Sequence, residues 1–222
     1  MGPTSLTVAL EAAIAAFIGY SEATVFPTGW GAGYGAITAL VRPDDQIMID
    51  ILAHASLQEG AMATTANVHR VPHLSTDGAA RRLARLREAE PQAGIMLITK
   101  GLFSMDSDIP DLAALQDLCH RHRATLLVDV AHDLGALGPI GRGALELQGM
   151  LGAVDVVIGS FSKAFAANGG FVASNHPALR TPCAMDRGRK PSAPPCRRFR
   201  PRSRWLRCRL WPVPKGPTAG QG

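Results

Sequence analysis

Hydrophobic residues follow two alternating patterns along residues 1–180. In the first, apolar residues recur three or four positions apart, as at Leu10, Ile14 and Ile18, which is typical of one face of a helix. In the second, apolar residues follow one another without interruption, which is typical of a strand buried on both faces. These runs lie at residues 23–26, 46–50, 94–99, 125–129 and 154–159, and helices are expected before the first run, from the Gly-rich residues 29–35 up to residue 42, from residue 75 or 76, and at 111–122. The alternation predicts an α/β fold with a mostly parallel sheet flanked by helices.

Reactive side chains stand where the predicted strands end. Ligands of open parallel sheets bind beyond the carboxyl ends of the strands. The residues found there, or in the segments that follow, are Asp50, Ser104, Asp129, Ser160 and Lys163. They are therefore the first candidates for a functional site.

The composition changes abruptly near residue 180. Residues 181–222 hold eleven Lys or Arg and one acid, and eight of the 16 Pro. Because the whole chain carries a formal net charge of +5, the tail carries +10 and residues 1–180 carry −5. We therefore predict a folded domain at 1–180 and a basic Pro/Arg-rich tail at 181–222. The tail could be a nucleic-acid arm that uses Trp205 and Trp211, a disordered extension, or an out-of-frame translation; the sudden loss of pattern favours the last and disfavours a nucleic-acid partner.

Several classes of protein are not supported by the sequence. No apolar run approaches the ~20 residues of a membrane-spanning helix, and the first six residues have neither a signal-peptide pattern nor a myristoylation motif; a cytoplasmic protein is expected. Cys119 is the single cysteine of residues 1–180, so no disulfide framework is expected. The pairs His69 with His73 and His120 with His122 lack the spacing and additional ligands of a metal site.

The glycine-rich segment at residues 29–36 indicates a phosphate site. It reads Gly-Trp-Gly-Ala-Gly-Tyr-Gly-Ala, and backbone N–H groups at the start of a helix can hold a phosphate. Counted from Gly31, with Gly33 and with Asp50 ending the next strand, it also matches the outline of a nicotinamide-dinucleotide site. A plain tight turn between a strand and a helix explains the segment equally well.

Asp129, Lys163 and His54 each allow a structural and a functional interpretation. Asp129 could cap a loop, or it could pair with a protonated pyridine nitrogen. Lys163 could extend into solvent, or it could act as an amine nucleophile. His54 alone is more typical of a structural histidine. Taken together, a phosphate segment, a strand-end acid and a lysine 34 residues after it suggest pyridoxal phosphate, which needs a lysine for a Schiff base and an acid at its ring nitrogen.

Three segments resemble the α-oxoamine synthases, which are fold-type-I pyridoxal phosphate enzymes related to the class I and II aminotransferases. They are residues 101–110 (GLFSMDSDIP), 128–143 (VDVAHDLGALGPIGRG) and 160–165 (SFSKAF). Residues 28–56 are similar to the same family without a gap, and the resemblance covers roughly residues 2–180. The chain departs from the family pattern at Val130, where an acid is usual.

The resemblance implies a role for each residue around the cofactor ring. Lys163 would form the Schiff base and later remove the α-proton of the substrate. Asp129 would keep the pyridine nitrogen protonated, and His54 would stack on the ring. His132 and Ser104 would hydrogen-bond the phenolic oxygen.

The resemblance likewise implies the phosphate ligands. These are the side chain of Ser160 and the backbone N–H groups of Gly29, Trp30 and Gly31.

The implied reaction is a decarboxylative condensation of an amino acid with an acyl-CoA. The resemblance also implies a homodimer with sites at the subunit interface, and a small C-terminal domain whose arginine binds the substrate carboxylate. Nothing in this sequence matches that small domain. We therefore expect the large domain of such an enzyme with the small domain missing, either as a condensing enzyme or as an inactive remnant that binds the cofactor.

Overall fold

The computed structural model describes residues 4–176. Its elements, in chain order, are α1 (Ser5–Ile18), β1 (Glu22–Phe26), α2 (Gly29–Leu40), β2 (Gln46–Asp50), α3 (Ala55–Thr64), β3 (Val68–Val71), α4 (Thr76–Ala89), β4 (Ile95–Lys100), α5 (Leu112–Arg121), β5 (Thr125–Asp129), α6 (Ala144–Leu147), β6 (Val156–Ser160) and β7 (Gly170–Ser174). The expected tail at 181–222 lies outside the described residues, and the domain boundary near residue 180 stays a prediction.

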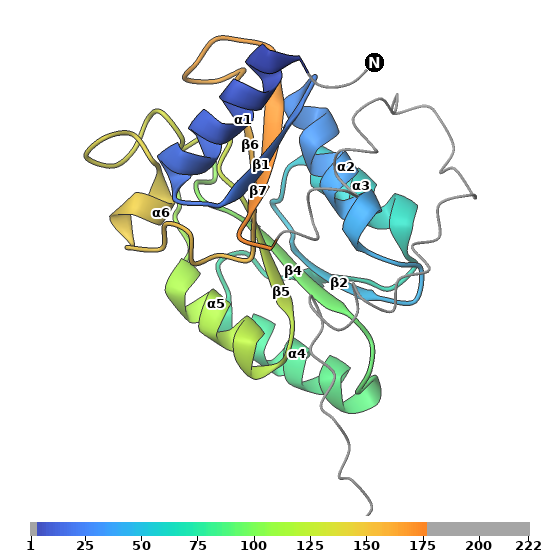
Figure 1. The fold of residues 1–222 in the computed structure, drawn as a ribbon. Coiled ribbons are helices and arrows are strands. Elements are labelled where there is room, and N and C mark those ends of the chain that lie inside the picture. The colour runs from blue at the N-terminus through green and yellow to red at the C-terminus, as the bar shows by residue number, and fades with distance from the viewer. Residues whose placement is uncertain (1–3, 177–222) are drawn as a thin grey trace, which may run out of the picture.

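A single seven-stranded sheet forms the middle layer (Figure 1). Its strand order is β1-β7-β6-β5-β4-β2-β3. Strands β3, β2, β4, β5 and β6 run parallel to one another, whereas β7 is antiparallel to both β6 and β1. The predicted fold class, an α/β fold with a mostly parallel sheet, is therefore confirmed.

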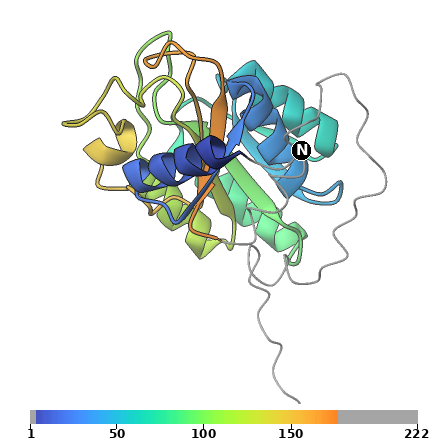
Figure 2. The ribbon, with the colours of Figure 1, turned by 45° about the horizontal axis from the view of Figure 1, so that its top comes forward.

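Helices cover both faces of the sheet (Figures 1 and 2). One apolar core lies between the sheet and α1, α4, α5 and α6, and the other lies between the sheet and α2 and α3. Successive strand residues alternate between these cores: in β4, Met96 and Ile98 pack toward α2 and α3, whereas Leu97 packs toward the opposite helices. This two-residue period sets the side of the sheet that each strand-end residue faces.

Side-chain caps explain where the longer helices begin. Thr4, Thr28, Ser75 and Asp111 each accept a hydrogen bond from a backbone N–H three residues further on. Such a cap satisfies one of the N–H groups that a helix leaves without an intrahelical partner. Of the two positions expected for the start of this helix, Ser75 is the cap and Thr76 is the first helical residue, and the helix expected at 111–122 is confirmed as α5.

Helices α3 and α6 and strand β7 were not expected from the sequence, and β3 is not among the apolar runs given above. Helix α3 begins directly after His54, and β7 follows the segment that carries Lys163. The antiparallel direction of β7 was also not expected, because an apolar run alone does not specify a strand's direction. Strand β7 returns the chain along β6 and pairs with β1 on its other side.

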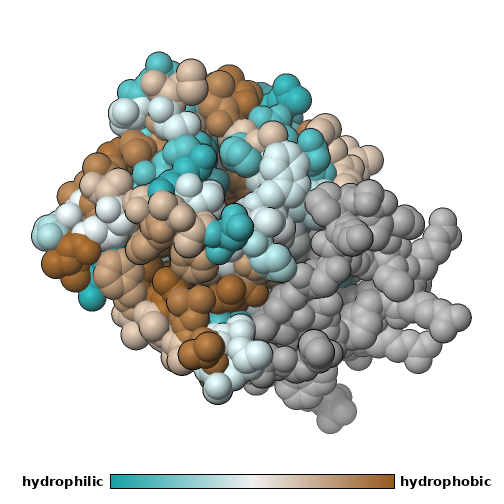
Figure 3. Space-filling model, turned by 90° about the horizontal axis from the view of Figure 1, so that it is seen from above, coloured by the Kyte–Doolittle hydropathy of each residue, from teal (hydrophilic) through white to brown (hydrophobic). Residues whose placement is uncertain are grey.

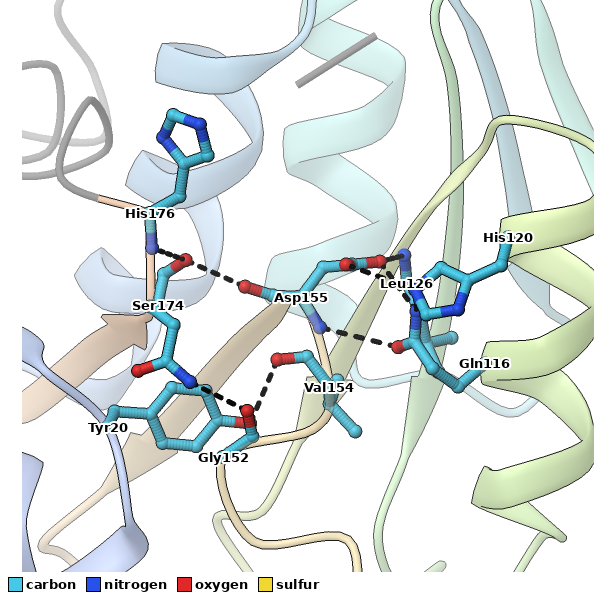
Figure 4. Close-up of polar contacts among 10 residues, drawn as sticks. Tyr20, Gln116, His120, Leu126, Gly152, Val154, Asp155, Ser174 and His176 are labelled. Atoms are coloured by element: carbon cyan, nitrogen blue, oxygen red, sulfur yellow. Dashed lines mark hydrogen bonds and ion pairs between the residues drawn. The ribbon is translucent and has the colours of Figure 1, made fainter. Parts of the chain in front are cut away.

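A polar network joins several elements at the amino ends of β5 and β6 (Figure 4). The Asp155 carboxylate accepts hydrogen bonds from Leu126 N at 2.8 Å and from Gln116 Nε2 at 3.0 Å. The Asp155 carbonyl accepts one from Ser174 Oγ at 2.8 Å, and Tyr20 donates to the neighbouring Val154 carbonyl at 3.0 Å. The network connects α5, β5, β6 and β7 at the end of the sheet opposite to the strand-end candidates.

Within the described part of the chain, no helix is both long and apolar enough to cross a membrane. Large apolar side chains still reach the surface, among them Leu6 and Met105. The face seen in Figure 3 intermixes hydrophobic and hydrophilic residues. Scattered exposure of this kind is ordinary for a folded protein.

Candidate functional site

Three chemically active residues end neighbouring strands and face the same side of the sheet. Lys100 ends β4, Asp129 ends β5 and Ser160 ends β6. Each stands two positions after a residue of the core under α2 and α3, so its side chain projects toward those helices. Lys100 and Asp129 are directly paired in the sheet register. Of the candidates expected at the strand ends, Asp129 and Ser160 therefore share one face, and Lys100, which was not expected, lies on the same face.

Asp129 is a buried carboxylate held by its own loop. Its Oδ1 accepts a hydrogen bond from Ala131 N at 3.0 Å. Burial raises the pKa of Asp129, while this hydrogen bond and the positive charge of Lys100 lower it. No ion pair within residues 4–176 joins Asp129 to a basic side chain. A buried carboxylate without such an ion pair is suited to bind a cationic group of a ligand.

The start of α2 lies directly against Ser160. A side chain at Gly29 would overlap the Ser160 side chain, and one at Gly170 would come within 2.7 Å of the Gly29 Cα. Ser160 Oγ is also 2.7 Å from Ser162 Oγ and accepts from Ser162 N at 3.2 Å. The close approach brings a helix N-terminus and two hydroxyl groups together, and this combination suits a phosphate.

The glycine-rich segment is helical rather than a separate turn. Helix α2 begins at Gly29, with Thr28 as its cap, and Gly31 N donates to Thr28 Oγ1 at 2.9 Å. The Gly31 N–H is therefore already used, and the N–H groups of Gly29 and Trp30 are those that the helix end leaves for a ligand. Gly33 serves helix packing instead, because a side chain there would press on Ser56 and Leu57 of α3.

Lys163 lies in the segment that joins β6 to β7. Its side chain is exposed, and the segment is closed by hydrogen bonds from Ala166 N to the Lys163 carbonyl at 3.1 Å and from Ala167 N to the Phe161 carbonyl at 2.9 Å. Ala166 has a φ of 48°, a left-handed conformation that is uncommon for a residue with a Cβ. Lys163 is thus held three residues beyond Ser160 on a tightly folded loop.

His54 caps α3 and contacts the start of α2. Its Nδ1 accepts from Ser56 N at 3.2 Å and lies 2.9 Å from Ser56 Oγ. Its ring meets the Trp30 ring edge-on, with centroids 5.7 Å apart. His54 therefore has a structural role as the cap of α3. Its ring is exposed and accessible to a ligand.

His132 and Asp133 follow β5 in the turn after Asp129. Burial, followed by the charge of Lys100, lowers the pKa of His132 to about 4, so its imidazole is neutral at neutral pH. Asp133 is 0% exposed; its Oδ2 accepts from Ala144 N at 2.8 Å, whereas its Oδ1 has no hydrogen-bond partner among the described residues. Burial raises the pKa of Asp133 to about 6.

Ser104 lies on an exposed turn fastened by His73. The turn is closed by a hydrogen bond from Phe103 N to the Asp108 carbonyl at 2.9 Å. His73 Nε2 lies 3.2 Å from Asp108 Oδ2, and His73 Nδ1 lies 3.1 Å from Asp50 Oδ1. Burial alone would lower the pKa of His73, but the hydrogen bonds to the two carboxylates raise it above its usual value.

Sequence reasoning missed three members of this region: Lys100, Asp133 and the bridge through His73. Lys100 carried a usable signal, since it ends an apolar strand as Asp129 does. The bridge carried none, because His73 and Asp108 are 35 residues apart in the chain.

The nicotinamide interpretation does not fit the fold. Its glycine segment follows β1, but Asp50 ends β2, and four strands separate β1 from β2 in the sheet. Asp50 belongs to the opposite face, two positions after Met48 of the other core. Its carboxylate already accepts from Leu52 N and contacts His73. Asp50 therefore does not share the face of the glycine segment.

These residues fit pyridoxal phosphate. The cofactor has an anionic phosphate and a protonatable ring nitrogen. The start of α2 at Ser160 provides a cradle that a side chain at Gly29 would fill, and Asp129 provides a buried carboxylate that no described basic side chain pairs with directly. When bound, the cofactor would supply an electron sink for carbanion chemistry.

Comparisons with curated proteins show what this chain is similar to. Serine palmitoyltransferase of Sphingomonas paucimobilis is 38% identical over 177 residues, 78% of this chain and 41% of that protein. 8-Amino-7-oxononanoate synthase of Pelobacter propionicus is 43% identical over 166 residues, 74% of this chain and 41% of that protein. This chain thus spans about two fifths of the length of these curated relatives.

Solved structures give the same result. The S. paucimobilis serine palmitoyltransferase with a bound PLP-myriocin aldimine matches with a TM-score of 0.75 and 33% identity, covering 84% of this chain and 50% of that chain. The family model "Aminotransferase class I and II" matches residues 1–188. The chain therefore belongs to the class I and II aminotransferase family, with α-oxoamine synthases among its relatives.

Proposed function

We propose that this chain is the cofactor-binding part of an α-oxoamine synthase, which binds pyridoxal phosphate and condenses an amino acid with an acyl-CoA, releasing carbon dioxide. The observation that carries the proposal is the shared edge of β5 and β6, where Asp129 and Ser160 face the same side of the sheet, the start of α2 lies against Ser160, and Lys163 follows three residues after Ser160. The relatives named above carry two such activities in their names, serine palmitoyltransferase and 8-amino-7-oxononanoate synthase.

Each residue would have a distinct role in this site. Lys163 would attach the cofactor through its amine and later take the α-proton of the substrate at Nζ. Asp129 would accept a hydrogen bond from the protonated ring nitrogen. His54 would cover one ring face, and the neutral His132, with Ser104, would hydrogen-bond the phenolic oxygen.

The phosphate would bind at the start of α2. Ser160 would donate its hydroxyl, and Gly29 and Trp30 would donate their backbone N–H groups. We leave Gly31 out of this set, because its N–H already bonds to Thr28.

The test of cofactor attachment is a visible absorption spectrum of the purified chain with added pyridoxal phosphate, followed by borohydride reduction and peptide mapping. We expect an absorption band and a reduced adduct on Lys163. The mapping separates Lys163 from Lys100, the other lysine of residues 4–176. Lys163→Ala and Lys163→Arg should both lose the band, since each lacks the primary amine. A band retained in both variants would contradict the proposal.

The condensation is tested by release of the CoA thiol from acyl-CoA in the presence of amino acids and cofactor. We expect thiol release that depends on Lys163. A cofactor adduct on Lys163 without thiol release for any amino acid would contradict condensation, and would support an inactive remnant that only binds the cofactor.

We also propose that two copies of the chain assemble around the site. Lys163, His54 and Ser104 are all exposed in the single chain, whereas the proposed chemistry needs protection from water. Light scattering after size exclusion should give the mass of a dimer. A monomer that binds the cofactor fully would contradict this proposal.

A further inference from the structure

The last residue of β4 brings a second amine to the candidate site. Lys100 is only 4% exposed, and with Lys163 it makes up the lysines of residues 4–176. It is directly paired with Asp129 on the adjacent parallel strand, and both follow residues of the core under α2 and α3. The two side chains therefore project from the same face of the sheet.

Charged and aromatic groups surround the Lys100 ammonium, and within residues 4–176 none of them forms a direct ion pair with it. Its Nζ lies 5.4 Å from the centroid of the Phe103 ring, a favourable placement for a cation. Burial lowers the pKa of Lys100, while Asp129 and Asp133, from the end of β5 and the turn after it, raise it. The positive charge of Lys163, in the segment after β6, also lowers the pKa of Lys100. The negative charge of Asp50, at the end of β2, raises it.

This ammonium acts on Asp129, which ends β5, and on His132, in the turn after β5. Among the charges near Asp129, Lys100 has the largest effect in lowering its pKa, ahead of His54 and Lys163. Among the charges near His132, Lys100 again has the largest effect, also ahead of Lys163 and His54. One positive charge thus favours an ionised acid and a neutral imidazole at the same time.

We propose that Lys100 is a positioning residue of this site: its buried ammonium, paired in register with Asp129 on the same face of the sheet, favours the carboxylate form of Asp129 and the neutral form of His132, so that one can hold a protonated ring nitrogen and the other can hydrogen-bond a phenolic oxygen. The meaning of this for the cofactor rests on the proposed function. The effect of the ammonium on the two side chains, however, exists in the cofactor-free protein and can be measured there.

The primary test is an NMR titration of the His132 imidazole in the cofactor-free chain, with its signal assigned by its loss in His132→Gln. In the wild type we expect a pKa of about 4. In Lys100→Met it should rise toward 6.5 without reaching that value, because the burial of the ring remains. Lys100→Arg keeps the charge and should restore the low value. Arg121→Met removes an exposed positive charge on α5 and should change nothing.

The second test is the pH dependence of pyridoxal phosphate binding. Without Lys100, Asp129 would take up a proton at a higher pH, so the loss of binding on acidification should begin at a higher pH in Lys100→Met than in the wild type or in Lys100→Arg. A merely structural role for Lys100 would lower stability without moving this profile.

The two proposals can fail separately. An unchanged His132 pKa in Lys100→Met, or an ordinary His132 pKa in the wild type, would overturn the role of Lys100 even if the cofactor binds to Lys163. The expected His132 shift in a chain that binds no cofactor would instead overturn the proposed function. Should Lys100→Met not fold, the wild-type titration and the same measurement on Lys100→Gln decide the matter.

Discussion

At the scale of single residues, the contact between Gly29 and Ser160 leaves no room for a side chain at position 29. A Cβ at Gly29 would overlap the Ser160 side chain, while a Cβ at Gly31 would meet only Thr28 Oγ1 at 3.1 Å. The first glycine is therefore required by close approach, and the second is not.

We predict that Gly29→Ala pushes the start of α2 away from β6. Overpacking of this kind costs about 1–3 kcal/mol, so urea unfolding should show a lower free energy of unfolding, and pyridoxal phosphate should bind at least about tenfold more weakly. Gly31→Ala is the matched control and should bind the cofactor nearly as the wild type does. Equal affinities for the two variants would contradict the cradle at Ser160.

The buried Asp133 makes a prediction about pH. Its folded-state pKa of about 6 lies above its ordinary value of 3.8, so the folded state holds the proton more tightly than the unfolded state does. The stability that this proton confers is present below pH 3.8 and is lost as the pH rises through 6. Urea titrations should therefore show a fall in the free energy of unfolding as the pH rises through this range, on the order of 3 kcal/mol from this group.

Asp133→Asn should remove that contribution, since an amide does not titrate in this range. Asp117→Asn changes an exposed acid paired with Arg121 on α5. This variant should keep the wild-type dependence of the free energy of unfolding on pH. If the free energy of unfolding of Asp133→Asn still falls with rising pH as in the wild type, the effect belongs to other groups.

The placement of a candidate residue was predictable where a single position in the sequence determined it. Asp129 and Lys163 follow apolar strands, and this placement is visible in the sequence. The neighbourhood of Lys100 and Asp129 was not predictable, because it depends on β4 and β5 being adjacent in the sheet. The use of the Gly31 N–H by Thr28 was hidden for a similar reason, since it depends on the helix beginning at Gly29.

At the scale of elements, His73 ties two segments of the site region together. It follows β3, contacts Asp50 at the end of β2, and reaches Asp108 on the turn that carries Ser104. Its ring also packs edge-on against Phe103, with centroids 4.4 Å apart. The position of the turn therefore depends on one imidazole.

We predict that His73→Ala destabilises the protein more at low pH than at high pH. Because the folded-state pKa of His73 is raised, its stabilising contribution is fully present below its unfolded pKa of about 6.5 and is lost as the pH rises through the folded value. After allowance for partial solvent screening, we expect a loss of about 1 kcal/mol at about pH 6 and less at about pH 9. Chemical denaturation at both pH values measures this.

His122 provides the comparison at the end of α5. Burial and the charge of Arg121 lower its pKa, so His122→Ala should show the opposite dependence on pH. The same trend in both variants would contradict the assignment of the effect to the two carboxylates around His73.

Whether an element could be predicted depended on how clearly its burial shows in the sequence. Strands β2, β4, β5 and β6 are buried at every position, and such strands appear in the sequence as unbroken apolar runs. Strand β7 is equally buried, but its short Gly-Phe-Val-Ala-Ser run lies beside a loop of small residues and gave no comparable signal. Helix α3 has a Gly and several polar residues, so its apolar period is weak.

At the scale of the whole molecule, the Asp155 network and the candidate site occupy opposite ends of the sheet. Asp155 satisfies the backbone N–H of Leu126 and the side chain of Gln116 (Figure 4). Its loss would leave buried donors without an acceptor, which costs about 1–3 kcal/mol for each group.

We therefore predict that Asp155→Ala lowers the free energy of unfolding by roughly 2 kcal/mol and leaves the absorption spectrum of the bound cofactor unchanged. Thermal unfolding and a cofactor titration measure the two effects on the same sample. A changed spectrum in a folded Asp155→Ala variant would show that the two ends of the sheet are coupled.

The place of β7 between β6 and β1 has a consequence for the order in which the chain can fold. Strand β1 is made early, but among the strands of residues 4–176 it pairs only with β7, and the two meet through residues 22–26 and 170–174. During synthesis, β1 must therefore wait until most of the domain has been made before it has a partner. Contacts of such long separation slow folding, and an unpaired strand edge is open to wrong partners in the meantime. Since α2 follows β1 directly, the phosphate cradle would be among the last parts of the protein to be completed, and a ribosome-bound chain would acquire it only once β7 had emerged.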